Sequence, residues 1–202
     1  MVQIYSIGIF KLPPNKIQNA TMLCKEFYLS GFGYFHKSGI KEALIFFMRT
    51  ISEQNNLSTR ETIIYQGYHC HIYIPKNGLG CCVITDEDYP QRVAFVLSIN
   101  IISSFLKKYQ MKWLGMKENQ ITDFNEMRES IVNYQDPEKA DKIYNINKQI
   151  DSTMNVMRKN IDKVLERGVK IEELVKKSKD LSHSSKQFYK TSKNLNRCCI
   201  IV

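Results

Sequence analysis

Residues 164–181 read VLERGVKIEELVKKSKDL, and apolar or small side chains recur in them at alternating steps of three and four residues. The same steps continue in both directions over 143–195, where there is no proline and a single glycine. A 3-4 repeat of this length predicts a coiled-coil helix, because such a long, narrow stripe is buried only against partner helices. The sixteen layers of this seam are Ile143, Ile146, Ile150, Thr153, Met157, Asn160, Val164, Arg167, Ile171, Leu174, Ser178, Leu181, Ser185, Phe188, Ser192 and Leu195.

The central layer of the seam is Arg167, the one charged residue among apolar, polar or small ones. Its guanidinium group has five N–H donors and no acceptor, so burying it unpaired would cost several kcal/mol. Partner helices are therefore expected to supply acceptors at this level, and the small layers Ser178, Ser185 and Ser192 leave room for bulkier partner side chains. A homodimeric coiled coil that tolerates Arg167 as a defect is the alternative. Without partners, the segment is expected to be disordered or folded back on its own domain.

The seam leads directly into Cys198-Cys199-Ile200-Ile201-Val202, which has the Cys-aliphatic-aliphatic-X pattern that prenyltransferases read. We expect a prenyl group on Cys199 and a second lipid on Cys198, because one chain binds membranes only weakly whereas two anchor stably. The terminal residue X of this motif selects the prenyl group, and Val202 is not a usual residue there. The sequence therefore does not decide between a farnesyl and a geranylgeranyl group. A chance cysteine pair is the alternative. The most apolar stretch, 93–106, is interrupted by polar residues and is shorter than the ~18 residues of a membrane span, so attachment is expected to come from lipid.

Positive charge is concentrated in the segment that precedes the cysteines. Residues 138–197 contain 15 Lys and Arg against 8 Asp and Glu, within a chain of net charge +9. This surplus favours an anionic membrane surface as a partner. Nucleic acid is not expected, because the lysines are spread around the helix and are not clustered with aromatic residues. The N-terminus shows no signal-peptide pattern, so the six cysteines are expected to be reduced thiols.

The first ~125 residues predict one sheet sandwiched by helices, which places the chain in the α+β class. The helix expected at 40–53 is apolar on more than one face, since Ile45 and Phe46 lie off its main stripe. It therefore needs either deep burial or a partner that covers the extra face. The expected elements are strands at 2–10, 20–32, 61–65, 69–74 and 79–85, and helices at 40–53, 90–109 and 123–134.

No catalytic residues and no metal site are expected. The N-terminal part contains no glycine-rich phosphate loop and no G-x-S-x-G elbow. His69 and His71 share one face of a strand while Cys70 takes the other, which does not suit a metal cluster. A cysteine enzyme, for example an acyltransferase that uses Cys70, Cys81 or Cys82, is the alternative, and it would need a thiol of unusually low pKa.

Val164-Leu165-Glu166-Arg167-Gly168, with Leu174, Leu181 and Phe188 in register, resembles the R-SNARE motif of synaptobrevins. The N-terminal order of elements resembles a longin domain, which has a profilin-like fold. With cysteines in place of a transmembrane tail, the whole chain is similar to prenylated longin R-SNAREs. Further matches are residues 69–73 (HCHIY), 89–95 (YPQRVAF) and 187–190 (QFYK).

The resemblance implies an α+β longin domain at 1–127, a linker at 128–137, a long helical R-SNARE segment at 138–197 and a lipidation tail at 198–202. Arg167 would join three Gln-type SNARE helices in a four-helix complex that drives vesicle fusion. Cys199 would carry the prenyl group, and Cys198 a palmitoyl or second prenyl chain; no other cofactor is implied.

In this family the longin domain also holds the SNARE segment and the lipid in a closed cytosolic form, through a groove that would include Phe46. The implied locations are the cytosol and the cytoplasmic face of endomembranes, from Golgi and ER to endosomal or vacuolar vesicles. A prenylated coiled-coil tether or trafficking regulator outside the SNARE complex is the alternative.

Overall fold

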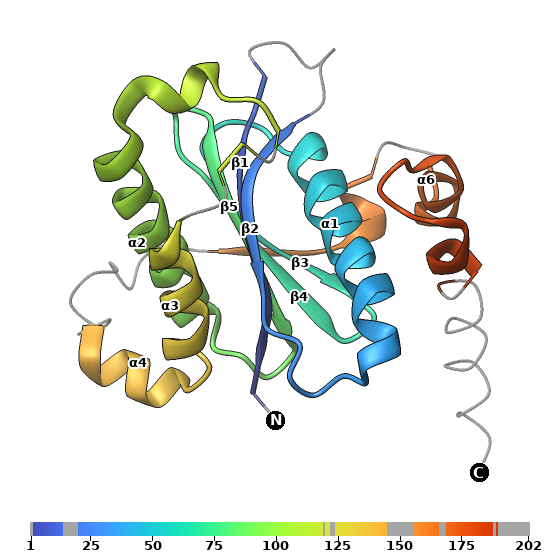
Figure 1. The fold of residues 1–202 in the computed structure, drawn as a ribbon, viewed down its shortest axis with the longest axis horizontal. Helices are drawn as coiled ribbons and strands as arrows, with labels where there is room; N and C mark the ends of the chain where they lie inside the picture. Colours follow the sequence, from blue (N-terminus) through green and yellow to red (C-terminus); the bar gives the residue numbers. More distant parts are fainter. Residues whose placement is uncertain are drawn as a thin grey trace.

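The computed structural model describes residues 2–13, 20–118, 120–121, 124–144, 156–165, 169–187 and 189, without the side chains of 143 and 144. They form one six-stranded sheet with helices on both faces (Figure 1), which confirms the α+β prediction. The strand order is β2 (Thr21–Phe27), β1 (Ile4–Lys11), β5 (Leu79–Asp86), β4 (Tyr68–Ile74), β3 (Thr59–Tyr65) and β6 (Met157–Asn160).

Most neighbouring strands are antiparallel, and only the β3–β6 pair is parallel, so the sheet is mixed. A tight turn joins β3 to β4, where Gln66 and Gly67 both have positive φ, as the favoured two-residue hairpin turns require. The predicted strand 20–32 is shorter in the structure. It ends at Phe27, and the chain then passes through a 3-10 turn, η1 (Tyr34–His36), into the first helix.

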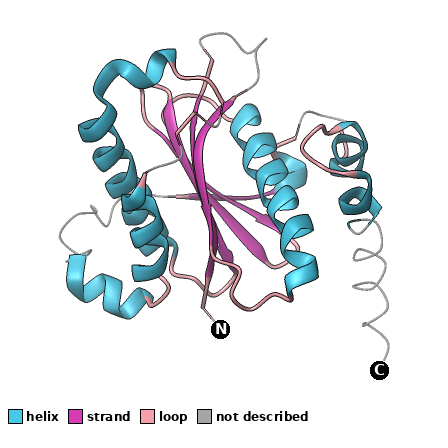
Figure 2. Ribbon diagram, in the orientation of Figure 1, coloured by secondary structure: helices cyan, strands magenta, loops and turns pink. Residues whose placement is uncertain are grey.

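The helices form two layers around the sheet (Figure 2). Helix α1 (Lys37–Gln54) covers one face, while α2 (Gln91–Tyr109) and α3 (Asn125–Asn133) cover the other, α2 being followed by the 3-10 turn η2 (Gln110–Gly115). Strand β1 is buried on both sides as a consequence. The α1 layer lies very close to β1, since a Cβ atom on Gly8 would meet Met48 Sδ at 2.7 Å.

Residues 128–137, which the sequence predicts as a linker, are packed against the domain. They continue α3 beyond residue 127, and Ile131 and Tyr134 lie buried in the core on the α2 side. The Tyr134 backbone carbonyl accepts a hydrogen bond from the Tyr89 hydroxyl at 2.8 Å. The apolar spacing that predicts the helix at 123–134 also explains why these residues do not act as a free connection. The domain boundary at 127 itself stays a prediction.

The described part of residues 138–197 is not one continuous helix. Helix α4 (Pro137–Tyr144) packs near α2, and strand β6 extends the sheet beside β3. They are followed by the 3-10 turn η3 (Ile161–Lys163), helix α6 (Ile171–Lys177) and a helical turn at 183–187. In a single chain there are no partner helices to bury the apolar stripe, and part of its described portion is buried on the N-terminal domain instead. This is one of the two states expected for the free chain.

His71 on β4 is fully buried between the sheet and α2. Its Nδ1 lies 2.9 Å from Thr62 Oγ1, its Nε2 lies 3.2 Å from Thr85 Oγ1, and its ring packs edge-on against Phe95. Burial, together with the nearby His69 and Arg158 charges, lowers the pKa of His71 to about 3. The imidazole is therefore a neutral structural group at pH 7, and both of its ring nitrogens lie within hydrogen-bonding distance of threonine hydroxyls.

This burial predicts an acid-sensitive fold. Below pH ~6.5, His71 is protonated in the unfolded chain but stays neutral in the folded chain. The free energy of unfolding therefore falls by about 1.4 kcal/mol for each unit by which the pH is lowered. From pH 7 to pH 5, urea unfolding of the wild type should therefore lose about 2 kcal/mol more than that of His71→Gln. His183→Gln, at an exposed histidine, is the matched control and should behave like the wild type. Parallel pH profiles for wild type and His71→Gln would contradict the assignment.

Candidate functional site

The described residues within 156–189 are called the C-terminal segment. This segment packs on the outer face of α1 and on the neighbouring edge of the sheet. In Figure 1, α6 lies beside α1, on the side away from the sheet. The α1 side of the core therefore includes residues from both ends of the chain. The contributions from the C-terminal segment are Ile161, Leu165, Ile171, Val175 and Leu181, all buried, with Val164, Leu174 and Tyr189 partly buried.

Phe46 lies at the centre of this contact. Its side chain is 4% exposed and packs edge-on against Phe47 on the same helix. On one side it lines a hollow together with Leu174 and Asp180, and on the other a hollow with Leu181. The extra apolar face of α1 that the sequence shows is therefore covered by the chain's own C-terminal segment.

An arginine on α1 holds the segment from the outside. Arg49 Nε donates to Asp180 Oδ2 at 2.7 Å, and the same guanidinium group pairs with Glu118 and donates to the Ala20 carbonyl at 3.2 Å. The Arg49 side chain is only 16% exposed and that of Asp180 22%, so solvent screens this pair less than a surface ion pair. The contact joins residues 131 positions apart in the sequence.

Two turns earlier on α1, Glu42 binds the start of the helical turn at 183–187. Its Oε2 accepts a hydrogen bond from the Ser182 backbone N–H at 2.7 Å. Burial opposes ionisation of Glu42, but the bonds from Ser182 and from the Ser185 hydroxyl outweigh it and lower the Glu42 pKa. Gly39 allows the close approach, since a Cβ atom there would lie 3.3 Å from Ser185 Oγ.

Polar contacts also fasten the segment to β3. Lys159 Nζ on β6 donates to Glu61 Oε1 at 2.6 Å, alongside the parallel backbone pairing of the two strands. Farther along, the hydroxyl groups of Tyr65 and Tyr189 are hydrogen-bonded to each other. Burial is the main reason that the pKa of both phenols is raised, so both stay protonated.

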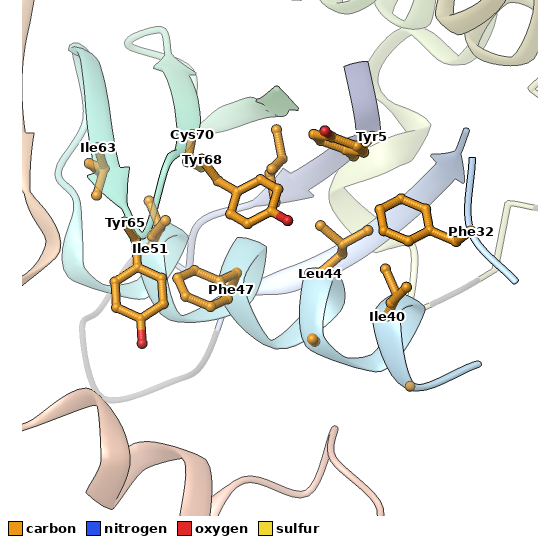
Figure 3. Close-up of a pocket in the computed structure, with 13 residues that line it drawn as sticks. Tyr5, Phe32, Ile40, Leu44, Phe47, Ile51, Ile63, Tyr65, Tyr68 and Cys70 are labelled. Carbon is orange, nitrogen blue, oxygen red and sulfur yellow. The ribbon is translucent and has the colours of Figure 1, made fainter. Parts of the chain in front are cut away.

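An apolar cavity of about 160 Å³ lies between α1 and the sheet, next to the docked segment (Figure 3). Phe47 and Leu44 from α1 face Tyr5, Tyr65 and Tyr68 across it. Phe46 does not line this cavity, because it lies on the neighbouring face of α1. A cavity of about 150 Å³ accepts one benzene-sized apolar group, so this cavity has room for a group of about that size.

Several predicted site residues fall outside the described residues: Arg167, Cys198, Cys199, the layers Ile146, Ile150, Thr153, Phe188, Ser192 and Leu195, and the side chain of Ile143. Of the described layers, Ile171, Leu181 and Ser185 are buried, Val164, Leu174 and Ser178 are half-buried, and Met157 and Asn160 are exposed. The seam is therefore only partly covered in this state.

The 3-4 repeat does not predict the buried residues that lie outside the seam, namely Ile161, Leu165 and Val175. The available signal was that the segment carries more apolar residues than one 3-4 stripe needs. Arg49 and Glu42 were missed as well. A charged residue on a helix surface gives no sign in the sequence of a partner so far along the chain.

The cysteines of the N-terminal domain do not form a catalytic site. Cys81 and Cys82 are fully buried, and burial raises the pKa of both thiols, which disfavours the reactive thiolate. Cys82 Sγ lies 2.8 Å from Cys70 Sγ, while His71 is occupied by two threonine hydroxyls. Among the described residues, no group of His, Cys, Asp and Glu suits a metal ion, and no helix is long and apolar enough to cross a membrane.

Comparison with known proteins agrees with this architecture. The regulated-SNARE-like (longin) family model matches residues 29–128 and the synaptobrevin model residues 142–201. The synaptobrevin homolog ykt6 of Schizosaccharomyces pombe is 36% identical over 202 residues, which cover 99% of this chain and 100% of that protein. The synaptobrevin homolog YKT6 of Saccharomyces cerevisiae is 35% identical over 203 residues, and the VAMP-like protein YKT61 of Arabidopsis thaliana 34% over 201, with 100% of both chains covered in each case.

These matches cover the N-terminal domain and the C-terminal segment together. Longin SNAREs are not enzymes, their partners are other SNAREs, and they act in membrane trafficking on the cytoplasmic side. The folded domain thus corresponds to the longin part, and the segment docked on α1 and β3 belongs to the synaptobrevin part. The chain belongs to the Ykt6 family of synaptobrevin homologues, SNAREs that combine a longin domain with a synaptobrevin segment.

Proposed function

We propose that this chain is an R-SNARE whose longin domain holds its SNARE segment in a closed form until partner helices are present. In the open form, the segment joins three Gln-type SNARE helices, with Arg167 in the central layer, and zippering towards the lipid end draws two membranes together. The observation that carries the proposal is the burial of the layer residues Ile171, Leu181 and Ser185 on the longin domain.

The two packings compete for the same side chains. Ile171 and Leu181 face the longin domain in the closed form and would face partner helices in a four-helix complex. Each buried aliphatic side chain contributes about 1.5–3 kcal/mol, offset by the entropy lost in ordering the segment. The closed form is therefore only moderately stable, and three well-matched partner helices should displace the longin domain.

Lipid anchoring belongs to the same proposal. Cys199 carries a prenyl group and Cys198 a palmitoyl or second prenyl chain, on the cytoplasmic face of endomembranes such as those of the Golgi. In the cytosolic form, the cavity beside Phe47 shelters part of the lipid. Its lining is aromatic and aliphatic, and each methylene removed from water contributes about 0.8 kcal/mol.

The central-layer assignment is tested with Arg167→Leu in complexes reconstituted from the full chain and three Gln-type SNARE motifs. Loss of the guanidinium donors leaves buried glutamine acceptors unpaired, at about 1–3 kcal/mol for each. We expect the complex to melt several degrees lower or to shift register, while the free chain stays folded. Calorimetry and cysteine cross-linking across the central layers measure the two effects.

Lys170→Leu is the matched control, because Lys170 is an exposed basic residue close to Arg167 that lies outside the seam. It should leave the complex unchanged. An Arg167→Leu complex with wild-type stability and register would refute the central-layer role. If the wild-type chain forms no heat-resistant complex with Gln-type motifs but binds itself or another coiled coil, the tether or homodimer alternatives hold instead.

A further inference from the structure

The turn that leads into α1 presents two aromatic rings to water. Among the described residues, Tyr34 and Phe35 are the most exposed large apolar side chains, at 84% and 92% exposure. Their rings pack edge-on against each other with centroids 5.8 Å apart, so they form one projecting unit. We name Tyr34 and Phe35 the aromatic tip. Leaving two aromatic rings in water is unfavourable, and such exposure marks an interaction site more often than a structural need.

The surroundings of the aromatic tip are cationic. Residues 27–41 contain no Asp or Glu, but they include Lys37 and Lys41. The two lysines are one helical turn apart on α1 and therefore share a side of the helix. The flanking acidic residues are already engaged, since Glu26 pairs with Arg128 and Glu42 accepts from Ser182.

Exposed aromatic rings beside lysines match the chemistry of a membrane surface. Tyrosine rings favour the boundary between headgroups and acyl chains, and each lysine near an anionic surface adds a favourable term. We propose that the aromatic tip inserts into the headgroup region of an anionic bilayer, with Lys37 and Lys41 on the lipid phosphates. A protein partner is disfavoured, because two aromatic side chains form a patch far smaller than the roughly 800 Å² that each partner buries in a standard protein interface.

The position of the tip gives this contact a further consequence, which rests on the proposed lipid anchor. Phe32, Gly39 and Ile40 flank the tip in the sequence, and all three line the apolar cavity between α1 and the sheet (Figure 3). Insertion of the tip therefore turns this end of the cavity towards the bilayer. A lipid held in the cavity would then pass into the membrane with little exposure to water.

The test uses the full chain without lipid, so that its result does not depend on Cys198 or Cys199. Binding is measured by flotation with vesicles of phosphatidylcholine alone and with about 30% phosphatidylserine. We expect binding to the anionic vesicles, a loss of roughly tenfold or more in Tyr34→Ser/Phe35→Ser, and of roughly fivefold or more in Lys37→Glu/Lys41→Glu. A Phe35→Trp reporter should shift its fluorescence to the blue on the same vesicles.

The matched control is Met111→Ser/Leu114→Ser, which removes two exposed apolar side chains from η2, a turn that also contains a lysine. This variant should bind like the wild type. The proposal would be overturned if the wild type bound neither kind of vesicle, or if Tyr34→Ser/Phe35→Ser bound like the wild type. It would also be overturned if Met111→Ser/Leu114→Ser lost as much binding as Tyr34→Ser/Phe35→Ser. The proposed SNARE role does not depend on this result. In turn, the vesicle result does not depend on the proposed lipid anchor, because the protein tested carries no lipid.

Discussion

Replacement of Cys199 by serine should end stable membrane attachment and move the protein to the cytosol. Prenylation of the Cys-aliphatic-aliphatic-X motif is expected to precede modification of Cys198, so one substitution removes both lipids. The aromatic tip alone gives reversible binding. Membrane flotation of cell extracts and intact mass spectrometry measure the two steps.

Two further variants separate the lipids. Cys198→Ser should keep the prenyl chain and bind reversibly, with an association constant on the order of 10⁴ M⁻¹ as for a single acyl chain. Val202→Ser gives a terminal residue typical of farnesylation and should stay attached, and its mass would identify the lipid by comparison with the wild type. Persistent membrane attachment of Cys199→Ser would exclude the lipid-anchor proposal.

Replacement of Phe46 by glutamate should open the molecule. Phe46 is buried by the docked segment, so a carboxylate at this position either stays buried at a high cost or is hydrated by release of the segment. We expect release, because burying a phenylalanine contributes only a few kcal/mol to docking. The open form should show a larger hydrodynamic radius, faster proteolysis within 156–189 and stronger membrane binding of the lipidated protein.

Val132→Glu is the control for this substitution, since it replaces an apolar residue that is 55% exposed on α3, which packs on the other face of the sheet. It should remain compact and protected. If Phe46→Glu is as compact and as protease-resistant as the wild type, the longin domain does not lock the segment through this face of α1. Circular dichroism establishes that the domain itself stays folded.

The ion pair between Arg49 and Asp180 provides a second, independent test of whether the longin domain holds the segment in the closed form. Asp180 lies outside the seam, so changing it should leave the four-helix complex intact. Arg49→Glu should loosen the segment by repelling Asp180 and Glu118, and adding Asp180→Arg should restore part of the closed population. Charge reversal without an effect on protection of the segment would show that Arg49 does not contribute to the lock.

The periodicity of the sequence determined most of the longin fold. The sequence predicted strands β1 to β5, with β2 too long, and the apolar surplus around Phe46 predicted that α1 needs a cover. These features are visible in the sequence because burial against a sheet imposes a period of two on strands and about 3.6 on helices. The lipidation motif and the position of Arg167 in the seam were likewise found without a structure.

Only the tertiary structure decided what covers α1 and how. The seam predicts a helix among partner helices, yet in the single chain Met157 to Asn160 form a strand on β3, while Ile161 and Val175 are buried from outside the seam. A 3-4 repeat reports which side chains can share one face, but not which of two apolar surfaces will bury them. That choice depends on contacts such as Arg49 with Asp180 and Glu42 with Ser182. Those contacts arise only when residues more than a hundred positions apart meet, and no local pattern encodes such a meeting.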